Sequence, residues 1–249
     1  MRKGFQKEPA MRATDDSFRA IMAGCRLKPT VILLVSTVTL ITWKCFASPQ
    51  YYLEQLSDRF VWFSDPQATA AVYHFLGALL LMGVVPALIV KFVFKESLAE
   101  YGVRFGNPVR TIRSFLVAVP IIALIAYAAA HTPSFWKDYP INRHAGASPQ
   151  IFALHVLSYL MLYLGWEFQF RGFMQRGLQE SMGLHNAILV QTMASVIMHL
   201  GKPVGEVYGS IIGGLIWGLL AYRTRSLLSG LLQHFLLGVL LDWFIIRSC

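Results

Sequence analysis

Charged residues are scarce in this chain. Asp, Glu, Lys and Arg make up only 14% of its 249 residues, whereas 55% are hydrophobic, and the mean hydropathy is +0.51. A soluble domain of this length would need roughly a quarter of its residues charged to cover its surface. The shortage of charge therefore excludes an ordinary soluble protein and indicates a chain that is largely embedded in lipid.

Cysteine is also rare. Cys25, Cys45 and Cys249 lie far apart and form none of the short spacings that are typical of metal sites. Cys249 is the last residue, so it cannot begin a C-terminal prenylation box, which needs three further residues. We expect inert thiols; acylation of Cys25, close to the first apolar run, is the alternative.

Long apolar runs, in contrast, are abundant. Several approach the roughly 20 residues that an α-helix needs to cross the hydrocarbon core of a bilayer. We predict an all-α, polytopic bundle of about seven membrane helices. The expected segments are residues 27–47, 71–94, 114–130, 151–170, 184–199, 207–221 and 227–246.

Basic and acidic residues alternate between the connecting segments. The leader 1–28 and the loop 95–113 are rich in Lys and Arg, whereas the loop 48–70 holds three acids and only Arg59. Because cytoplasmic segments carry the excess of Lys and Arg, we expect a cytoplasmic N-terminus and an external Cys249. The net charge is +9, and its basic residues gather in the leader and in the loop 95–113. The predicted partner is therefore the lipid bilayer with its anionic headgroups, not nucleic acid.

The polar chemistry is concentrated in the second half of the chain. We therefore divide the sequence into a basic cytoplasmic leader (1–28), N-terminal membrane helices and loops (29–150) and a functional membrane core (151–249). The pattern fits a multi-pass protein of a bacterial plasma membrane. It specifies no oligomeric state.

Four ionisable residues fall within apolar segments of this core. Glu167, His199, His234 and Asp242 lie on three separate segments, which a helical bundle can bring together. Ionisable groups are expensive inside a membrane, so each indicates a functional site by default. They are the candidate site residues.

Glu167 belongs to a regular polar stripe. Counting in fours gives His155, Tyr159, Tyr163, Glu167 and Arg171, which lie along one side of a helix. Such a stripe must face protein or a water-filled cavity, because lipid offers no hydrogen-bond partners. The simpler alternative is that Glu167 and Arg171 only neutralise each other, and that His155 is structural.

The other candidates have simpler alternatives as well. His199 is followed by glycine and proline residues that should end its helix, so it could simply cap that helix. Glu206 could be an acid in the first turn of the next helix, where the helix dipole favours negative charge. His234 and Asp242 are two turns apart, about 80° around the helix axis, so no direct bond between them is expected. In the purely structural alternative, His234 is bonded to a backbone carbonyl and Asp242 reaches the membrane interface.

Three motifs in this order resemble those of the CPBP intramembrane proteases. They are Trp-Glu-Phe-Gln-Phe-Arg-Gly at 166–172, Ala-Ser-Val-Ile-Met-His at 194–199, and the histidine of the last helix, His234. The family includes the CAAX-processing endopeptidase and bacterial proteins linked to bacteriocin self-immunity. Its motifs are Glu-Glu-x-x-x-Arg, Phe-x-x-x-His and His-x-x-x-Asn or Asp. Trp166, Ser195 and Gly238 depart from them.

The resemblance implies an intramembrane endopeptidase of the glutamic type that cleaves a membrane-associated protein or peptide. Glu167 and His199 would activate a water, and His234 would donate to the developing oxyanion. Arg171 would hold Glu167 in place. Asp242 would supply the missing Asn contribution or orient a histidine. In the family the first glutamate is implicated as the base, and Trp166 occupies that position here.

Three other functions stay open at this point. A zinc-dependent peptidase fits two His and one or two carboxylates, although no tight ligand spacing is present, and no other cofactor is expected. A non-catalytic relative, acting as an immunity factor or scaffold, fits the substituted motif positions. A proton-coupled transporter fits intramembrane His and Asp, but no paired broken helices indicate inverted repeats.

Overall fold

A computed structural model describes residues 27–248 as an all-α fold, which confirms the predicted class. The basic leader up to residue 26, Cys25 and Cys249 lie outside the described residues. Cys45 is a free, exposed thiol. The division of the chain at residue 150 and the orientation in the membrane stay predictions.

Six helical runs in the described part of the chain are long and apolar enough to cross a membrane, so the protein is an integral, multi-pass membrane protein. The runs consist of α2 (Leu27–Phe46); α4 (Pro66–Ala78) continued by η1 (Leu79–Val84), α5 (Val85–Leu88) and η2 (Ile89–Val93); α6 (Pro108–Ala130); α8 (Pro149–Glu167) continued by η3 (Phe168–Arg176) and α9 (Gly177–Met198); α10 (Val204–Thr224); and α11 (Leu228–Ser248). Two short helices, α3 (Pro49–Gln55) and α7 (Pro133–Trp136), lie in the loops.

The difference from the expected seven segments arises in the run Pro149–Met198. This run contains both expected segments, 151–170 and 184–199, but it is not straight, because Gly183 has non-helical dihedrals (φ 79°, ψ 161°). A straight helix would hold residues 166 and 199 about 50 Å apart. The rings of Trp166 and His199 instead lie 5.2 Å apart. The chain therefore turns back at Gly183 and forms a helical hairpin.

Local sequence explains where several helices begin. A polar residue followed by proline starts each of α3, α4, α6 and α8. The side chain of the polar residue accepts a hydrogen bond from a backbone N–H of the first turn, and proline fits the first helical position, where no donor is needed. The four pairs are Ser48-Pro49, Asp65-Pro66, Asn107-Pro108 and Ser148-Pro149.

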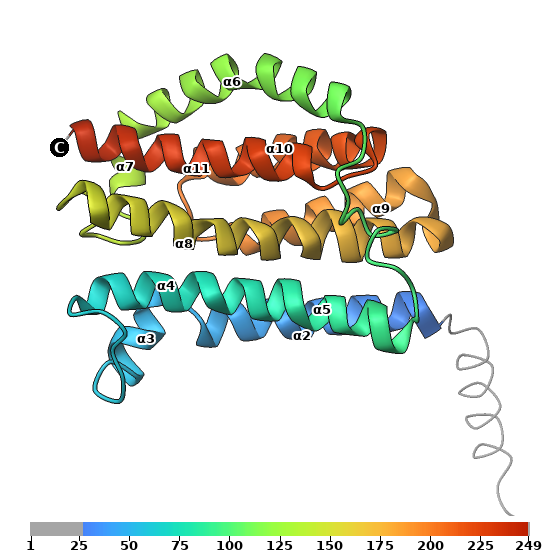
Figure 1. Cartoon of the computed structure of the whole chain (residues 1–249), viewed down its shortest axis with the longest axis horizontal. Coiled ribbons are helices and arrows are strands. Elements are labelled where there is room, and N and C mark those ends of the chain that lie inside the picture. Colours follow the sequence, from blue (N-terminus) through green and yellow to red (C-terminus); the bar gives the residue numbers. More distant parts are fainter. Residues whose placement is uncertain (1–26, 249) are drawn as a thin grey trace, which may run out of the picture.

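The long helices run side by side in rows (Figure 1). The run α8–η3–α9 lies between a row made by α2 with α4 and α5 and a row made by α10 with α11. Helix α6 packs on α11 at the outside and contains Pro120, which removes a backbone hydrogen bond and favours a bend. Because the central run contacts both rows, its side chains are the most buried of the bundle, and the candidate site lies on it.

Candidate active site

Glu167 ends α8 and is buried, with 1% of its surface exposed. Its Oε1 atom accepts a hydrogen bond from Nδ1 of His234 at 2.9 Å and lies 3.4 Å from Nη1 of Arg171. Its Oε2 atom is buried and has no hydrogen-bond partner among residues 27–248. A Cβ atom at Gly230 would come within 2.7 Å of this oxygen, so the glycine lets the carboxylate approach α11. The candidates Glu167, Arg171 and His234 are thus brought together.

The predicted polar stripe of α8 faces α11. The rings of Tyr163 and His234 have centroids 4.7 Å apart, and the hydroxyl of Tyr163 occupies the space that a side chain at Gly238 would need. At the far end of the stripe His155 Nε2 lies 2.7 Å from Asp242 Oδ2. The stripe of α8 therefore runs along α11 in the antiparallel direction, from the contact of Glu167 with His234 to the contact of His155 with Asp242.

Asp242 is fully buried and is bonded to His155. The interpretation that it reaches the membrane interface is therefore wrong. The histidine that it contacts is His155, at a point two turns of α11, about 12 Å, from His234. His155 is the residue that the sequence interpretation set aside; its place on the stripe was the only signal for a role in this contact.

His199 lies at the end of α9, where its ring is held by the helix itself. Its Nδ1 donates to the carbonyl of Ser195 at 2.7 Å, so Nε2 is the nitrogen left for a ligand. That atom lies 3.9 Å from Oε1 of Glu206, a separation that leaves no direct hydrogen bond. The described contacts of Glu167 do not include His199.

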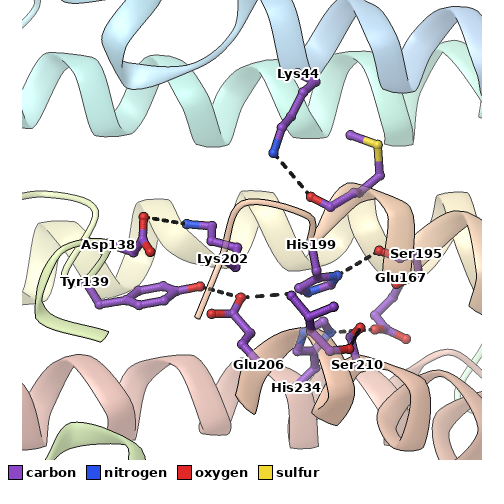
Figure 2. Close-up of polar contacts among 12 residues, drawn as sticks. Lys44, Asp138, Tyr139, Glu167, Ser195, His199, Lys202, Glu206, Ser210 and His234 are labelled. Atoms are coloured by element: carbon purple, nitrogen blue, oxygen red, sulfur yellow. Dashed lines mark hydrogen bonds and ion pairs between the residues drawn. The ribbon is translucent and has the colours of Figure 1, made fainter. Parts of the chain in front are cut away.

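Glu206 is the acid that the sequence interpretation assigned only to a helix start. It lies in the first turn of α10, and its Oε1 accepts a hydrogen bond from the hydroxyl of Tyr139 at 2.8 Å. Its Oε2 is buried and has no hydrogen-bond partner in the described part of the chain. Figure 2 shows the resulting row of Tyr139, Glu206, His199 and Ser195, next to the Glu167–His234 pair.

Two cavities meet at these residues. One, of about 680 Å³ and largely apolar, is lined by α6, α10 and α11; the other, of about 630 Å³ and more polar, is bordered by α2, α3 and the loop 137–143. Six side chains line both cavities: Tyr139, Tyr159, Tyr163, His199, Glu206 and His234. Glu167 lines neither of them, because it lies behind His234.

Aromatic rings fix the orientation of the histidines. His234 stacks on Trp217 with ring centroids 4.2 Å apart, while its Nδ1 is bonded to Glu167. Trp166, which stands at the first glutamate position of the motif, is buried and has its ring 5.2 Å from His199 and 6.4 Å from His234. The indole at this position of the motif thus lies next to the rings of both histidines.

No three His, Cys, Asp or Glu side chains among residues 27–248 are grouped closely enough to hold a metal ion. The two histidines of the site each direct Nδ1 to a protein acceptor, His199 to a carbonyl and His234 to a carboxylate. The arrangement supplies two imidazole Nε2 atoms and one carboxylate, Glu206, at a junction of cavities. These groups suit proton transfer and hydrogen bonding to a polar reactant.

Comparison with known proteins identifies one family. Residues 148–240, which contain all three motifs, match the family described as type II CAAX prenyl endopeptidase Rce1-like. No curated protein and no solved structure matches the chain. The match begins at the N-cap of α8 and ends within α11, so it includes Glu167, His199, Glu206 and His234.

Proposed function

Residues 148–240 are a domain of the Rce1-like type II CAAX prenyl endopeptidase family, and on this basis we propose that the chain is an intramembrane endopeptidase. Its substrate would be a membrane-associated protein or peptide, cleaved by an activated water. The catalytic group would comprise His199 and His234 together with Glu167.

One observation carries the proposal. His199 and His234 lie where an apolar cavity between α6, α10 and α11 meets a polar one. Hydrolysis in a membrane needs a place for an apolar substrate segment and a path for water, and these two requirements meet at the histidines. A peptide bond held at the junction would lie within reach of both Nε2 atoms.

The contacts of each residue support a role. His234 is clamped by Trp217 and bonded to Glu167, so its Nε2 has a fixed direction and can donate to the oxyanion of a tetrahedral intermediate. Glu167 would balance the charge that the ring carries when it donates, as a carboxylate does beside a catalytic histidine. Arg171 would hold Glu167 in place across the 3.4 Å contact.

A substrate-independent experiment tests the proposal. The purified protein is reconstituted with membrane proteins extracted from its expression host, in water enriched in ¹⁸O. Peptide-bond hydrolysis places one ¹⁸O atom in each new C-terminal carboxyl group, which mass spectrometry detects. We expect labelled C-termini with the wild-type protein and a loss of them with His199→Ala and His234→Ala.

Two outcomes of this assay would contradict the peptidase proposal. If the wild-type protein gives no more labelled C-termini than the empty vesicles, or if both histidine variants cleave as the wild type does, the peptidase proposal is wrong. A non-catalytic relative or a transporter would then remain. Addition and removal of Zn²⁺ in the same assay tests the zinc-dependent alternative, which predicts cleavage only with the metal.

A further inference from the structure

We propose that Glu206 is a catalytic residue: its carboxylate takes the proton from the attacking water, with His199 beside it. This inference rests on the proposed peptidase function. It assigns the base to an acid of α10, whereas Glu167 becomes a positioning residue that acts through His234. The family motifs do not include the position of Glu206.

The turn between α9 and α10 brings Glu206 to His199. Gly201 has a positive φ of 94°, and Lys202 N donates to the His199 carbonyl at 3.0 Å, so the chain reverses within a few residues. The end of α9 and the first turn of α10 therefore lie next to each other. As a result Glu206 Oε1 lies 3.9 Å from His199 Nε2.

The usual reason for a glutamate at this helix position does not apply. Glu206 is the third residue of α10, where a glutamate normally accepts a hydrogen bond from the backbone N–H of the N-cap residue. The N-cap here is Pro203, which has no N–H. The carboxylate therefore has no capping bond to make and points to Tyr139 and His199 instead (Figure 2).

The two oxygens of Glu206 have different surroundings. Oε1 is held by the hydroxyl of Tyr139, which donates at 2.8 Å. Oε2 is buried and has no hydrogen-bond partner among the described residues. A buried carboxylate oxygen without a partner is unfavourable unless a ligand or a water satisfies it. The residue lines both cavities, and its Oε1 lies 3.9 Å from His199 Nε2, so a water that enters between the carboxylate and the ring would sit where the cavities meet.

Glu167 is less suited to this step. Its Oε1 is taken by His234 and Arg171, and its Oε2 lies against Gly230 of α11. It lines neither cavity. Of the two carboxylates near the histidines, Glu206 is thus the one that faces the space where a substrate can bind.

The reaction balances with these groups. The water oxygen bonds to the carbonyl carbon while one of its protons passes to the carboxylate of Glu206. The other hydrogen stays on the oxygen and donates a hydrogen bond to His199 Nε2. His234 donates from Nε2 to the oxyanion. The carbon–nitrogen bond then breaks, and the leaving nitrogen takes the proton from Glu206. The products are a carboxylic acid and an amine, and the Glu206 carboxylate is regenerated.

The test uses the ¹⁸O assay with the full chain reconstituted as above. We expect Glu206→Gln to lower the rate of label incorporation by about 10²- to 10⁴-fold, the range typical of a general base. Glu54→Gln is the matched control, because Glu54 borders the same polar cavity without facing a histidine; it should cleave at the wild-type rate. Glu206→Ala should regain cleavage when formate is added, since formate replaces the missing carboxylate.

A merely structural role gives a different pattern. If Glu206 only anchored Tyr139, then Tyr139→Phe would lose as much activity as Glu206→Gln; we expect about a tenfold loss or less from this one hydrogen bond. Wild-type activity of Glu206→Gln, with His199→Ala and His234→Ala inactive, would overturn the assignment and leave the peptidase function standing. Absence of cleavage by the wild type would overturn both.

Discussion

Nδ1 of His234 lies 2.9 Å from Oε1 of Glu167, across the contact between α8 and α11. This bond links the final helix to the helix that carries the first motif. It commits one ring nitrogen to the protein and leaves the other for the cavity. Whatever reacts in the cavity therefore meets an imidazole whose direction is set by a buried carboxylate.

The first prediction concerns the ion pair between Glu167 and Arg171. Glu167→Gln leaves the guanidinium of Arg171 buried without a counter-charge, so the free energy of unfolding should fall by about 3–5 kcal/mol. The measurement is thermal or denaturant unfolding of the protein in detergent. The double variant Glu167→Gln with Arg171→Met removes both charges and should recover most of that loss. Equal destabilisation of the single and double variants would contradict the role of Glu167 as the counter-ion.

The second prediction concerns the close approach of α8 and α11. A Cβ atom at Gly238 would overlap the hydroxyl of Tyr163, so Gly238→Ala should destabilise the protein by about 1–3 kcal/mol. Gly209→Ala is the matched control, because a Cβ atom there meets nothing within 4 Å. It should be neutral or stabilising, since alanine favours the helix. Adding Tyr163→Phe to Gly238→Ala should recover part of the loss; no recovery would place the strain elsewhere.

The third prediction concerns the buried bond between His155 and Asp242. Both residues are at most 2% exposed, so loss of either partner leaves a buried polar group unsatisfied. Each of His155→Phe and Asp242→Leu should lower the free energy of unfolding by about 1–3 kcal/mol. In a double-mutant cycle the two effects should be strongly non-additive, because the double variant leaves neither partner behind. Additive effects would show that the two residues stabilise the fold independently.

The fourth prediction concerns the pH dependence of stability that arises from Glu96, in the loop after η2. Burial acts to raise the pKa of Glu96, but hydrogen bonds from Lys28 and Tyr101 outweigh it, so its pKa lies below the ordinary value for Glu. The unfolded chain then binds a proton more readily than the folded one. The stability that this acid contributes is therefore present above the ordinary glutamate pKa and is lost as the pH falls through the lowered pKa. Unfolding of Glu96→Gln should show a weaker loss of stability over that acidic range than the wild type; identical pH profiles would contradict it.

The sequence was sufficient for much of the fold. Apolar length identified the membrane segments, and the i, i+4 spacing of Tyr159, Tyr163 and Glu167 identified one face of a helix, since both are properties of the chain within a single element. The four polar residue and proline pairs also set helix starts locally. The three motifs identified the family, because they depend on residue types and order alone.

Contacts between helices could not be predicted from the sequence and became known only from the tertiary structure. The bond of Asp242 to His155, and of Glu167 to His234, depends on the register of α8 against α11. The π-helical segment η3 after Glu167 is likewise a departure from regular helix geometry that no sequence pattern predicted. Periodicity within one segment carries no information about that register.

The sequence by itself therefore determined that this is a multi-pass helical membrane protein with buried polar groups, and that residues 148–240 match a CAAX endopeptidase family. Only the tertiary structure decided which acid meets which histidine. It placed Glu167 behind His234 and Glu206 beside His199, although Glu206 was in the sequence an ordinary first-turn acid. The physical reason is that a side chain's partner is fixed by how helices cross and turn. Those crossings are set by the close packing of glycines and rings from distant segments.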